Sequence, residues 1–387
     1  MSYIWNLPTK VLFGAGMLKQ LASQELPGKK ALVLISNGRS ARVNGSLDSV
    51  MAQLSQAGVA TVLCANIPAN PTDTAMDEAV ALVRAEGCDF VIGLGGGSVL
   101  DAATIIAAVA PQEGRVWDYV QGGTGGRRPL TRTPLPWIAI TTSAGTGSEV
   151  DRWGVVTNPA THEKIGFQGG YACLAIVDPA LMLTVPPTYT AYQGFDALFH
   201  SLEGYVSRFA NEASDMVELE AIRAIATYLP HAVRDGADLE ARTRMAFANT
   251  MSGYSMELCS CVSEHSLEHA MSGFHGHLPH GAGLIMISAA YFSKWIEKGA
   301  CPERFITMAR ALGRADASDP MDFIAALVSL QEACGVANLK MSDYGITPDE
   351  FPALAANARA TMGGLYACDR FDMTDEDVVD IYTRSYR

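Results

Sequence analysis

The chain has 387 residues, of which 49% are hydrophobic, and a formal net charge of −13 at pH 7. One hydrophobic core rarely grows past about 250–300 residues, so we expect two domains, and the negative charge argues against nucleic acid or an anionic membrane as a partner. Because the sequence shows neither a basic-then-apolar leader nor an apolar run of roughly 18 residues, we expect a cytoplasmic protein that does not span a membrane.

The first half of the chain alternates apolar runs with longer amphipathic runs. The apolar runs predict strands at 30–36, 60–67, 89–95 and 135–142, and the runs between them predict helices at 41–58, 73–87 and 99–110. Strands separated by helices of this length are typical of βαβ units and a parallel sheet.

The pattern changes near Pro186 and Pro187. From Tyr189 onward, long runs rich in Ala, Leu and Met predict helices, for example over 213–229 and 240–259, and no further strand–helix–strand unit is evident. We therefore predict an α/β domain over 1–184, followed by an all-helical domain over 185–387.

A glycine turn connects the strand at 89–95 to the next predicted helix. Gly96 and Gly97 let the backbone approach a phosphate, and the helix that follows offers free N–H groups and the positive end of its dipole. Ser98 can donate to a phosphate or cap the helix, and Asp101 follows in the first turn. No GK[ST] follows, and Ser98 replaces the third glycine of the dinucleotide fingerprint, so a plain strand-to-helix turn is the alternative.

A second loop, at 141–149, is rich in hydroxyls and glycines and follows the strand at 135–142. Its Thr141, Thr142 and Thr146 stand at the carboxyl end of a strand, where α/β sheets bind ligands. A structural Ser/Thr-rich turn is the alternative. Two such loops in one sheet favour a bound dinucleotide more than either loop does alone.

Most of the histidines lie in one short segment, and a further one follows an aspartate on a predicted helix. Five of the eight lie within sixteen residues, at His265, His269, His275, His277 and His280. A sixth, His200, follows Asp196 by four residues, which places the two side chains on one helical face. A carboxylate and several imidazoles are suitable ligands for one divalent iron, zinc or manganese ion.

The eight cysteines are dispersed and include no CxxC pair, so we interpret them as reduced thiols. Cys259 and Cys261 lie close together, but we interpret their run as helical. This favours packing over a zinc site.

These segments, in this order, resemble the iron-containing (group III) alcohol dehydrogenase family. The resemblance runs along the whole chain and is carried by Phe13-Gly14, Asn70-Pro71-Thr72, GGGSVLD (95–101), AGTGSEV (144–150), Asp178-Pro179, GFDALFHSLEGY (194–205), HSLEH (265–269) and LPHG (278–281). It implies an N-terminal Rossmann-like parallel-sheet domain that binds a dinucleotide and a C-terminal all-helical domain, with a metal in the cleft between them. The implied reaction is the reversible NAD(P)-dependent oxidation of an alcohol, with hydride transfer between the nicotinamide and a metal-bound alcohol or carbonyl.

By this resemblance, the metal is Fe(II), with Zn(II) as the alternative, and its ligands are Asp196, His200, His265 and His280. The spacing between His269 and His280 is one residue longer than usual in the family. His275 and His277 therefore compete with His280, which we keep because it stands in a Pro-His-Gly sequence.

Two further residues have implied roles around the metal. His269 matches a family histidine that orients the substrate or relays a proton, and its titration near neutrality suits that role. A packed histidine, hydrogen-bonded to Glu268 or Glu264, is the alternative. Glu203 is expected to orient a ligand imidazole.

The resemblance assigns cofactor contacts to twelve positions: Ser36, Gly38, Asn70, Gly96, Gly97, Ser98, Asp101, Thr141, Thr142, Thr146, Lys164 and Leu181. A solvated loop lysine is the alternative for Lys164. Many family members have Asp at the position of Ser36, where it binds the ribose 2′-OH and repels a 2′-phosphate, so we favour NADP over NAD. Thr104 replaces a family lysine, which removes a cation near the phosphates.

Other reaction classes are less well supported. A dehydroquinate-synthase-like lyase needs several basic substrate-binding residues, which are sparse here, and a glycerol-dehydrogenase-like enzyme differs mainly in ligand count and substrate. A metal-storage protein would have no use for the two glycine loops. We expect a small alcohol or aldehyde as the substrate and a homodimer or larger assembly. Arg152 is a candidate anchor for an anionic group, with a surface salt bridge as the alternative.

Overall fold

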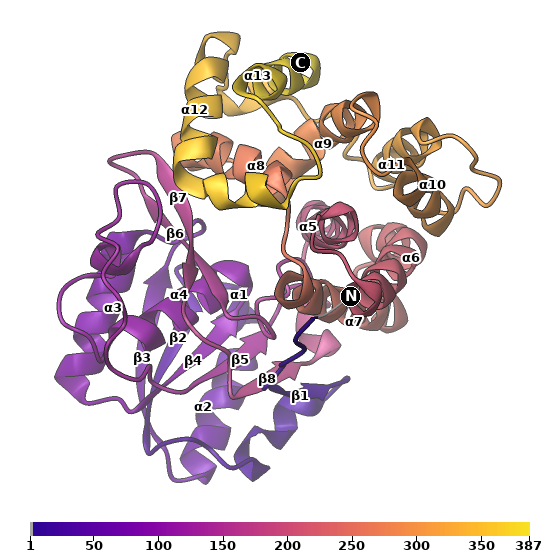
Figure 1. Ribbon diagram of the computed structural model, residues 1–387. Coiled ribbons are helices and arrows are strands. Elements are labelled where there is room, and N and C mark those ends of the chain that lie inside the picture. The colour runs from indigo at the N-terminus through magenta and orange to yellow at the C-terminus, as the bar shows by residue number, and fades with distance from the viewer. Residues whose placement is uncertain (1–2) are drawn as a thin grey trace.

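A six-stranded parallel sheet forms the N-terminal part of the protein in the computed structural model, which describes residues 3–387 (Figure 1). The strands run in the order β1-β8-β5-β4-β2-β3, and β6 and β7 form a separate antiparallel hairpin. The strands are β1 (Lys10–Phe13), β2 (Lys30–Ser36), β3 (Ala60–Ile67), β4 (Phe90–Gly95), β5 (Trp137–Thr141), β6 (Trp153–Asn158), β7 (Glu163–Gln168) and β8 (Leu174–Val177).

Helices flank this sheet and then make up the rest of the chain. Those of the N-terminal part are η1 (Met17–Ser23), α1 (Ser40–Val43), α2 (Ser46–Gln56), α3 (Asp73–Glu86), α4 (Gly97–Val109), η2 (Val116–Tyr119) and η3 (Pro179–Met182). The C-terminal part contains α5 (Pro187–Val206), α6 (Glu212–Arg234), α7 (Leu239–Leu258), α8 (Ser263–Phe274), α9 (His280–Glu297), α10 (Pro302–Ala311), α11 (Met321–Ala333), η4 (Met341–Tyr344), η5 (Pro348–Glu350), α12 (Phe351–Met362), η6 (Gly363–Cys368) and α13 (Asp375–Ser385). A parallel sheet followed by a mostly helical part confirms the predicted fold class.

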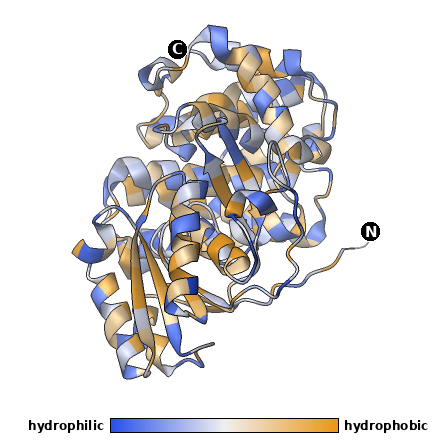
Figure 2. Ribbon diagram, turned by 90° about the vertical axis from the view of Figure 1, so that its left-hand side faces the viewer, coloured by the Kyte–Doolittle hydropathy of each residue, from blue (hydrophilic) through white to orange (hydrophobic). Residues whose placement is uncertain are grey.

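The two faces of the sheet are covered by different helices. Leu32 and Leu34 pack with α3 and α4, whereas Val33 and Ile35 pack with η1 and α2. Successive side chains of a strand point to opposite faces, so a strand covered on both sides needs an unbroken apolar run such as that of β2. Figure 2 shows these apolar strands enclosed by helices.

Two details of the predicted secondary structure are wrong. The run 41–58 forms two helices, because Gly45 adopts a left-handed φ of +76° that an α-helix does not accommodate. The N-terminal part also contains β1, the β6–β7 hairpin and β8, which sequence analysis missed. Strands of four to six residues carry little periodicity, so short runs of this kind are hard to recognise.

We propose a domain boundary near residue 184, between η3 and α5, which gives domains 1–184 and 185–387. One hydrophobic core nevertheless crosses this boundary, since Val177 of β8 packs in the same cluster as Phe195 and Leu198 of α5. Among residues 3–387, no helix combines the length and the apolar character that crossing a membrane requires.

Glu218, on α6, is a buried carboxyl whose protonation we expect to affect stability. Its Oε1 accepts hydrogen bonds from Ser255 Oγ (2.8 Å) and Cys259 Sγ (2.8 Å), and burial raises its pKa to about 8. An unfolded glutamate has a pKa of about 4.3, so between these two values the folded state holds a proton that the unfolded state has lost. The free energy of unfolding therefore falls as pH rises through this window.

We expect Glu218→Gln to have a stability within about 1 kcal/mol of the parent near pH 5, where both side chains are neutral. Above about pH 8, the parent bears the cost of a buried charge and the variant does not, so the variant becomes the more stable protein. Urea unfolding at the two pH values measures the change. An equal difference at both would contradict this account.

Candidate metal and cofactor site

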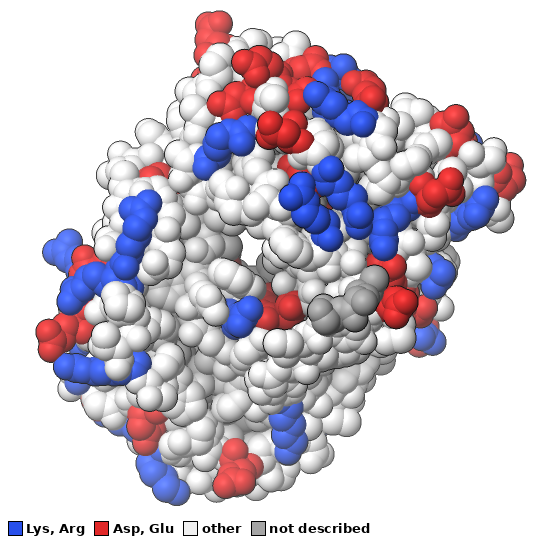
Figure 3. All heavy atoms as spheres, viewed as in Figure 1, with Lys and Arg blue, Asp and Glu red and all other residues white. Residues whose placement is uncertain are grey.

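A cavity of about 490 Å³ opens between the sheet and the helical part. Figure 3 shows the molecule hollowed between its lower and upper parts. Nine of the residues predicted from sequence line this cavity: Asn70, Ser98, Asp101, Thr146 and Lys164 from the N-terminal part, and His200, His265, His269 and His280 from the helical part.

The four predicted metal ligands lie close together at this cavity. Asp196 and His200 are one turn apart on α5, His265 lies on α8, and His280 is the first residue of α9. The Oδ1 atom of Asp196 is 3.5 Å from His200 Nδ1, 3.7 Å from His265 Nε2 and 3.5 Å from His280 Nε2. Three helices thus direct three imidazoles towards one carboxylate.

The donor atoms of this cluster fit a divalent cation. Asp196 Oδ1, His200 Nδ1 and His265 Nε2 are buried and have no hydrogen-bond partner among the described residues. Desolvation lowers the pKa of His200 to about 3, which leaves its imidazole neutral. Burial by itself would raise the pKa of Asp196, but His200 and His280 hold it well below its usual range. The neutral imidazole of His200 and the ionised carboxylate of Asp196 are the protonation states that metal ligation requires of these two groups.

A second carboxylate lies behind each of two ligand imidazoles. Glu203 hydrogen-bonds His265 Nδ1, and Glu268 hydrogen-bonds His280 Nδ1. Both glutamates are fully buried. Carboxylates in this position fix the tautomer and orientation of a ligand imidazole, so that Nε2 faces the metal. This role was expected for Glu203, whereas Glu268 was a candidate partner of His269.

His269 lies on α8 one turn after His265, and its ring centroid is 5.4 Å from that of His280. Its Nδ1 atom has no hydrogen-bond partner among the described residues, so this nitrogen does not bond to Glu268 or Glu264. Desolvation, with the nearby Lys164 charge, lowers its pKa well below the usual value. His269 is therefore a neutral imidazole facing the cavity.

The two competing histidines lie apart from the cluster. His275 Nε2 is 3.2 Å from a carboxylate oxygen of Glu350, and the ring centroid of His277 is 6.2 Å from that of Tyr344. The lengthened loop that carries them also reaches the N-terminal part, since Asn70 donates a hydrogen bond to the carbonyl of Gly276 (3.1 Å).

Lys164 is a buried residue of β7, so the alternative of a solvated loop lysine is wrong. Its Nζ atom lies 3.0 Å from Ser272 Oγ, 3.4 Å from Glu268 Oε2 and 3.5 Å from His280 Nδ1. The hairpin thereby brings a cation to the carboxylate that orients His280.

The two glycine loops meet at the carboxyl edge of the sheet. The backbone N–H of Thr142 donates to the carbonyl of Gly95 (2.9 Å). A Cβ atom on Gly97 would lie 2.3 Å from Thr146 Cγ2, so a side chain there would push the second loop away. Gly97 also begins α4, whose N-terminus, with Ser98, faces the cavity. This edge can hold an anionic cofactor group.

The remaining predicted cofactor residues lie outside the cavity lining. Ser36 and Gly38 stand at the end of β2, two strands from β5 at the same sheet edge, and Leu181 lies in η3 after β8. Thr141 donates its hydroxyl to the carbonyl of Ser143 (3.1 Å). The others outside the lining are Gly96, Gly97 and Thr142.

Local contacts explain Thr104, which departs from the family pattern, and Arg152, the candidate anchor for an anionic group. Thr104 is buried and donates its hydroxyl to the carbonyl of Gly170 (2.9 Å), and a Cβ atom on Gly154 would lie 2.8 Å from its methyl group, which leaves little room for a lysine. Arg152 pairs with Glu257 (3.3 Å), so the salt-bridge alternative describes it.

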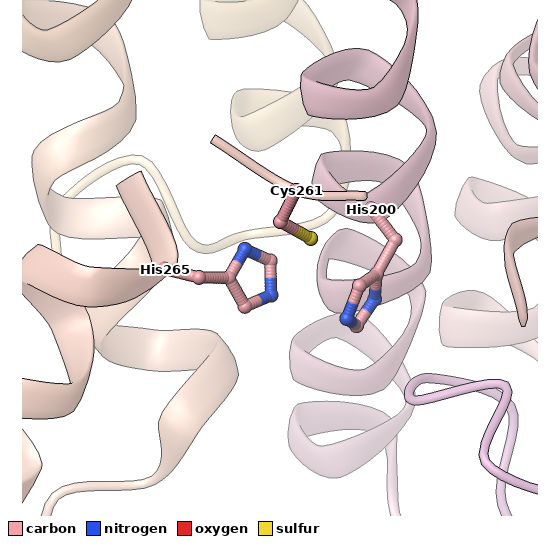
Figure 4. Close-up of side chains that lie close together, drawn as sticks. All are labelled: His200, Cys261 and His265. Atoms are coloured by element: carbon pink, nitrogen blue, oxygen red, sulfur yellow. The ribbon is translucent and has the colours of Figure 1, made fainter. Parts of the chain in front are cut away.

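Cys261, which we interpreted from the sequence as a packing residue, lies at this site. Its run is not helical as predicted but forms the connection between α7 and α8. Its sulfur lies close to the rings of His200 and His265 (Figure 4), whereas Cys259 Sγ donates to Glu218. The spacing of four residues before His265 was the available signal.

Comparisons with known proteins agree along the whole chain. Residues 8–179 match the family described as iron-containing alcohol dehydrogenase, and residues 190–386 match the C-terminal part of the Fe-containing alcohol dehydrogenase family. The chain is 32% identical over 364 residues to 1,3-propanediol dehydrogenase of Klebsiella pneumoniae, with 91% of each protein covered. It is 30% identical over 375 residues to NAD-dependent methanol dehydrogenase of Bacillus methanolicus, with 91% of this chain and 92% of the relative covered. The solved structure of an archaeal halo-thermophilic alcohol dehydrogenase from a Red Sea brine pool matches with a TM-score of 0.94 at 32% identity, covering 100% of this chain and 99% of that one.

Proposed function

Because the chain belongs to the iron-containing alcohol dehydrogenase family, we propose that it oxidises a small alcohol reversibly to an aldehyde or ketone, using a divalent metal and a nicotinamide dinucleotide. One observation carries this proposal. A single cavity is lined by Ser98 and Thr146 of the two glycine loops on one side and by His265 and His280 on the other. We also propose that the protein assembles as a homodimer or a larger homo-oligomer, by analogy with its family.

Asp196, His200, His265 and His280 would hold the metal, for which we propose Fe(II), with Zn(II) as the alternative. Their unpartnered buried nitrogen and oxygen atoms support this assignment. When bound, the metal acts as a Lewis acid on the substrate oxygen, and the nicotinamide accepts or supplies the hydride.

The protein's own side chains would position the reactants and move a proton. Glu203 and Glu268 hold the imidazoles of His265 and His280 in one tautomer, with Nε2 towards the metal. His269, neutral and within the same cavity, would take the proton of the alcohol at its ring nitrogen or return it during reduction.

The two glycine loops and Lys164 would hold the dinucleotide, and we propose NADP as the preferred form. No carboxylate stands at Ser36 to repel a 2′-phosphate, and the next side chains include Arg39 and Arg42. The relative from Bacillus methanolicus is NAD-dependent, and the variant described next distinguishes the two cofactors.

We expect Ser36→Asp to raise the KM for NADPH on the order of tenfold, because a carboxylate beside the 2′-phosphate adds repulsion of about 1.4 kcal/mol or more. The KM for NADH should stay the same or fall. Ser36→Asn, which adds similar volume without charge, is the matched control. If both cofactors were affected alike, Ser36 would not face the 2′ position.

The experiment that tests the function is anaerobic reconstitution of metal-stripped protein. Fe(II) or Zn(II) is added, and oxidation of NADPH or NADH is followed with a panel of aldehydes. Metal-dependent oxidation of the reduced cofactor supports the proposal. Bound metal and bound cofactor without hydride transfer to any carbonyl would overturn it.

A further inference from the structure

Cys261 occupies an unusual place beside the proposed metal ligands. It lies in the short non-helical connection between α7 and α8, and only 1% of its surface is exposed. Its Sγ atom, one ring nitrogen of His200 and one of His265 all lie within 4.8 Å of one another. Figure 4 shows the thiol and the two rings directed into the same space.

Among the described residues, no conventional hydrogen bond explains the three groups as packing, although His200 Nδ1 and His265 Nε2 lie 3.5 and 3.7 Å from Asp196 Oδ1. His200 Nδ1 and His265 Nε2 are buried without a hydrogen-bond partner among the described residues. The short contact of the Cys261 thiol is with the weakly accepting Met256 Sδ, at 3.1 Å. By contrast, Cys259 Sγ donates to a carboxylate oxygen of Glu218 (2.8 Å). The thiol of Cys261 is therefore placed like a ligand, and that of Cys259 like a hydrogen-bond donor.

Two donor sets share His265. Asp196, His265 and His280 form one set, with an oxygen and two nitrogens, and His200, Cys261 and His265 form the other, with a sulfur and two nitrogens. Glu203 holds Nδ1 of the shared ring, which leaves Nε2 for either set. Thiolate ligands select softer ions such as Zn(II), whereas carboxylates suit harder ions such as Mn(II).

We propose that this cavity offers two overlapping metal positions, and that Cys261 is a direct ligand of Zn(II) and Co(II) at the nitrogen–sulfur position. The inference rests on the proposed metal site and deepens it. When the ion binds, the S–H bond of Cys261 breaks, its proton passes to solvent, and a sulfur–metal bond forms without any change of oxidation state. The identity of the metal then decides which ligands hold it.

Co(II) is the probe, because its absorption reports binding and sulfur ligation separately. The metal-stripped full-length protein is titrated anaerobically, with visible ligand-field bands reporting bound Co(II) and a near-ultraviolet charge-transfer band reporting a thiolate ligand. We expect both signals in the parent. Cys261→Ser should keep the visible bands and lose the charge-transfer band, while Cys259→Ser should keep both.

A second measurement compares metal affinities by competition with a chelator. We expect Cys261→Ser to weaken Zn(II) binding about tenfold or more, since loss of an outer-shell partner alone costs that much. Mn(II) binding should be unchanged, because its ligands are the carboxylate and imidazoles.

The outcomes separate this inference from the proposed function. Visible bands without a charge-transfer band in the parent would overturn the role of Cys261 and leave the metal site intact. A charge-transfer band that survives in Cys261→Ser but disappears in Cys368→Ser would assign the sulfur to the other cysteine lining the cavity. Absence of any bound Co(II) in the parent would overturn both the metal site and this inference.

Discussion

His280→Ala is expected to abolish tight metal binding and to lower kcat/KM for alcohol oxidation by about 10²–10⁴-fold, since a metal acting as a Lewis acid supplies several kcal/mol of transition-state stabilisation. The His280 ring connects two parts of the site. Its Nε2 atom lies 3.5 Å from Asp196 Oδ1, and its Nδ1 atom is held by Glu268. Metal content by elemental analysis and kcat/KM on the same samples are the two measurements.

The lengthened loop supplies the matched controls for this prediction. His277 and His275 lie three and five residues before His280, and they contact Tyr344 and Glu350 rather than the cluster. We expect His277→Ala and His275→Ala to retain the metal and to keep kcat/KM within about threefold. Substitutions away from a core, a binding site or a buried polar network usually change the free energy of unfolding by no more than about 0.5 kcal/mol. If His275→Ala or His277→Ala lost the metal while His280→Ala kept it, the third imidazole ligand would be that loop histidine and not His280.

Glu268→Gln is expected to weaken metal binding by about 10–100-fold and also to destabilise the fold. Glu268 is fully buried and contacts both His280 Nδ1 and Lys164 Nζ. An amide cannot hold the His280 imidazole through a charge-assisted hydrogen bond, which explains the lost affinity. It also leaves the Lys164 ammonium buried without a counter-ion, a change that typically costs about 3–5 kcal/mol. Chelator competition and urea unfolding of the metal-free protein measure the two effects separately.

Glu264→Gln is the control on the same helix. Glu264 is equally buried, neither of its oxygens has a hydrogen-bond partner among the described residues, and burial raises its pKa well above the usual value. Burial therefore favours the neutral form of this carboxyl, and a glutamine replaces that form with almost the same shape and charge. We expect near-parental metal affinity and stability. Equal losses in the two variants would mean that any change in this buried helix disturbs the site.

Much of the fold was predictable because its signals are local. The apolar run of β2 and the helix that ends before Gly87 follow from strand burial and from a left-handed glycine at a helix end. The strands β1 and β8 were not predictable in the same way. Each has four residues and is a strand because it pairs with a neighbour distant in sequence, as Lys10 pairs with Leu174.

For the candidate site as well, local signals could be predicted from the sequence and long-range contacts could not. Spacing within one helix places Asp196 beside His200, and resemblance to a family points to His265 and His280. No spacing in the sequence indicates that Glu268 turns towards His280 rather than His269. Nor does any spacing indicate that Lys164, on a hairpin more than a hundred residues earlier, reaches Glu268 and His280. These choices depend on how three helices and a hairpin pack, since each polar group takes the partner that packing brings within reach.

The alternation of strands and helices, the helical second half and the residue types able to hold a metal can be recognised from the sequence, because they depend on neighbours along the chain. Three features of the site follow instead from packing: His275 and His277 lie outside the cluster, Thr104 fills the space of a lysine, and Cys261 faces His200 and His265. Each of these outcomes depends on the distance between elements remote in sequence, which the packing of the sheet against the helices sets.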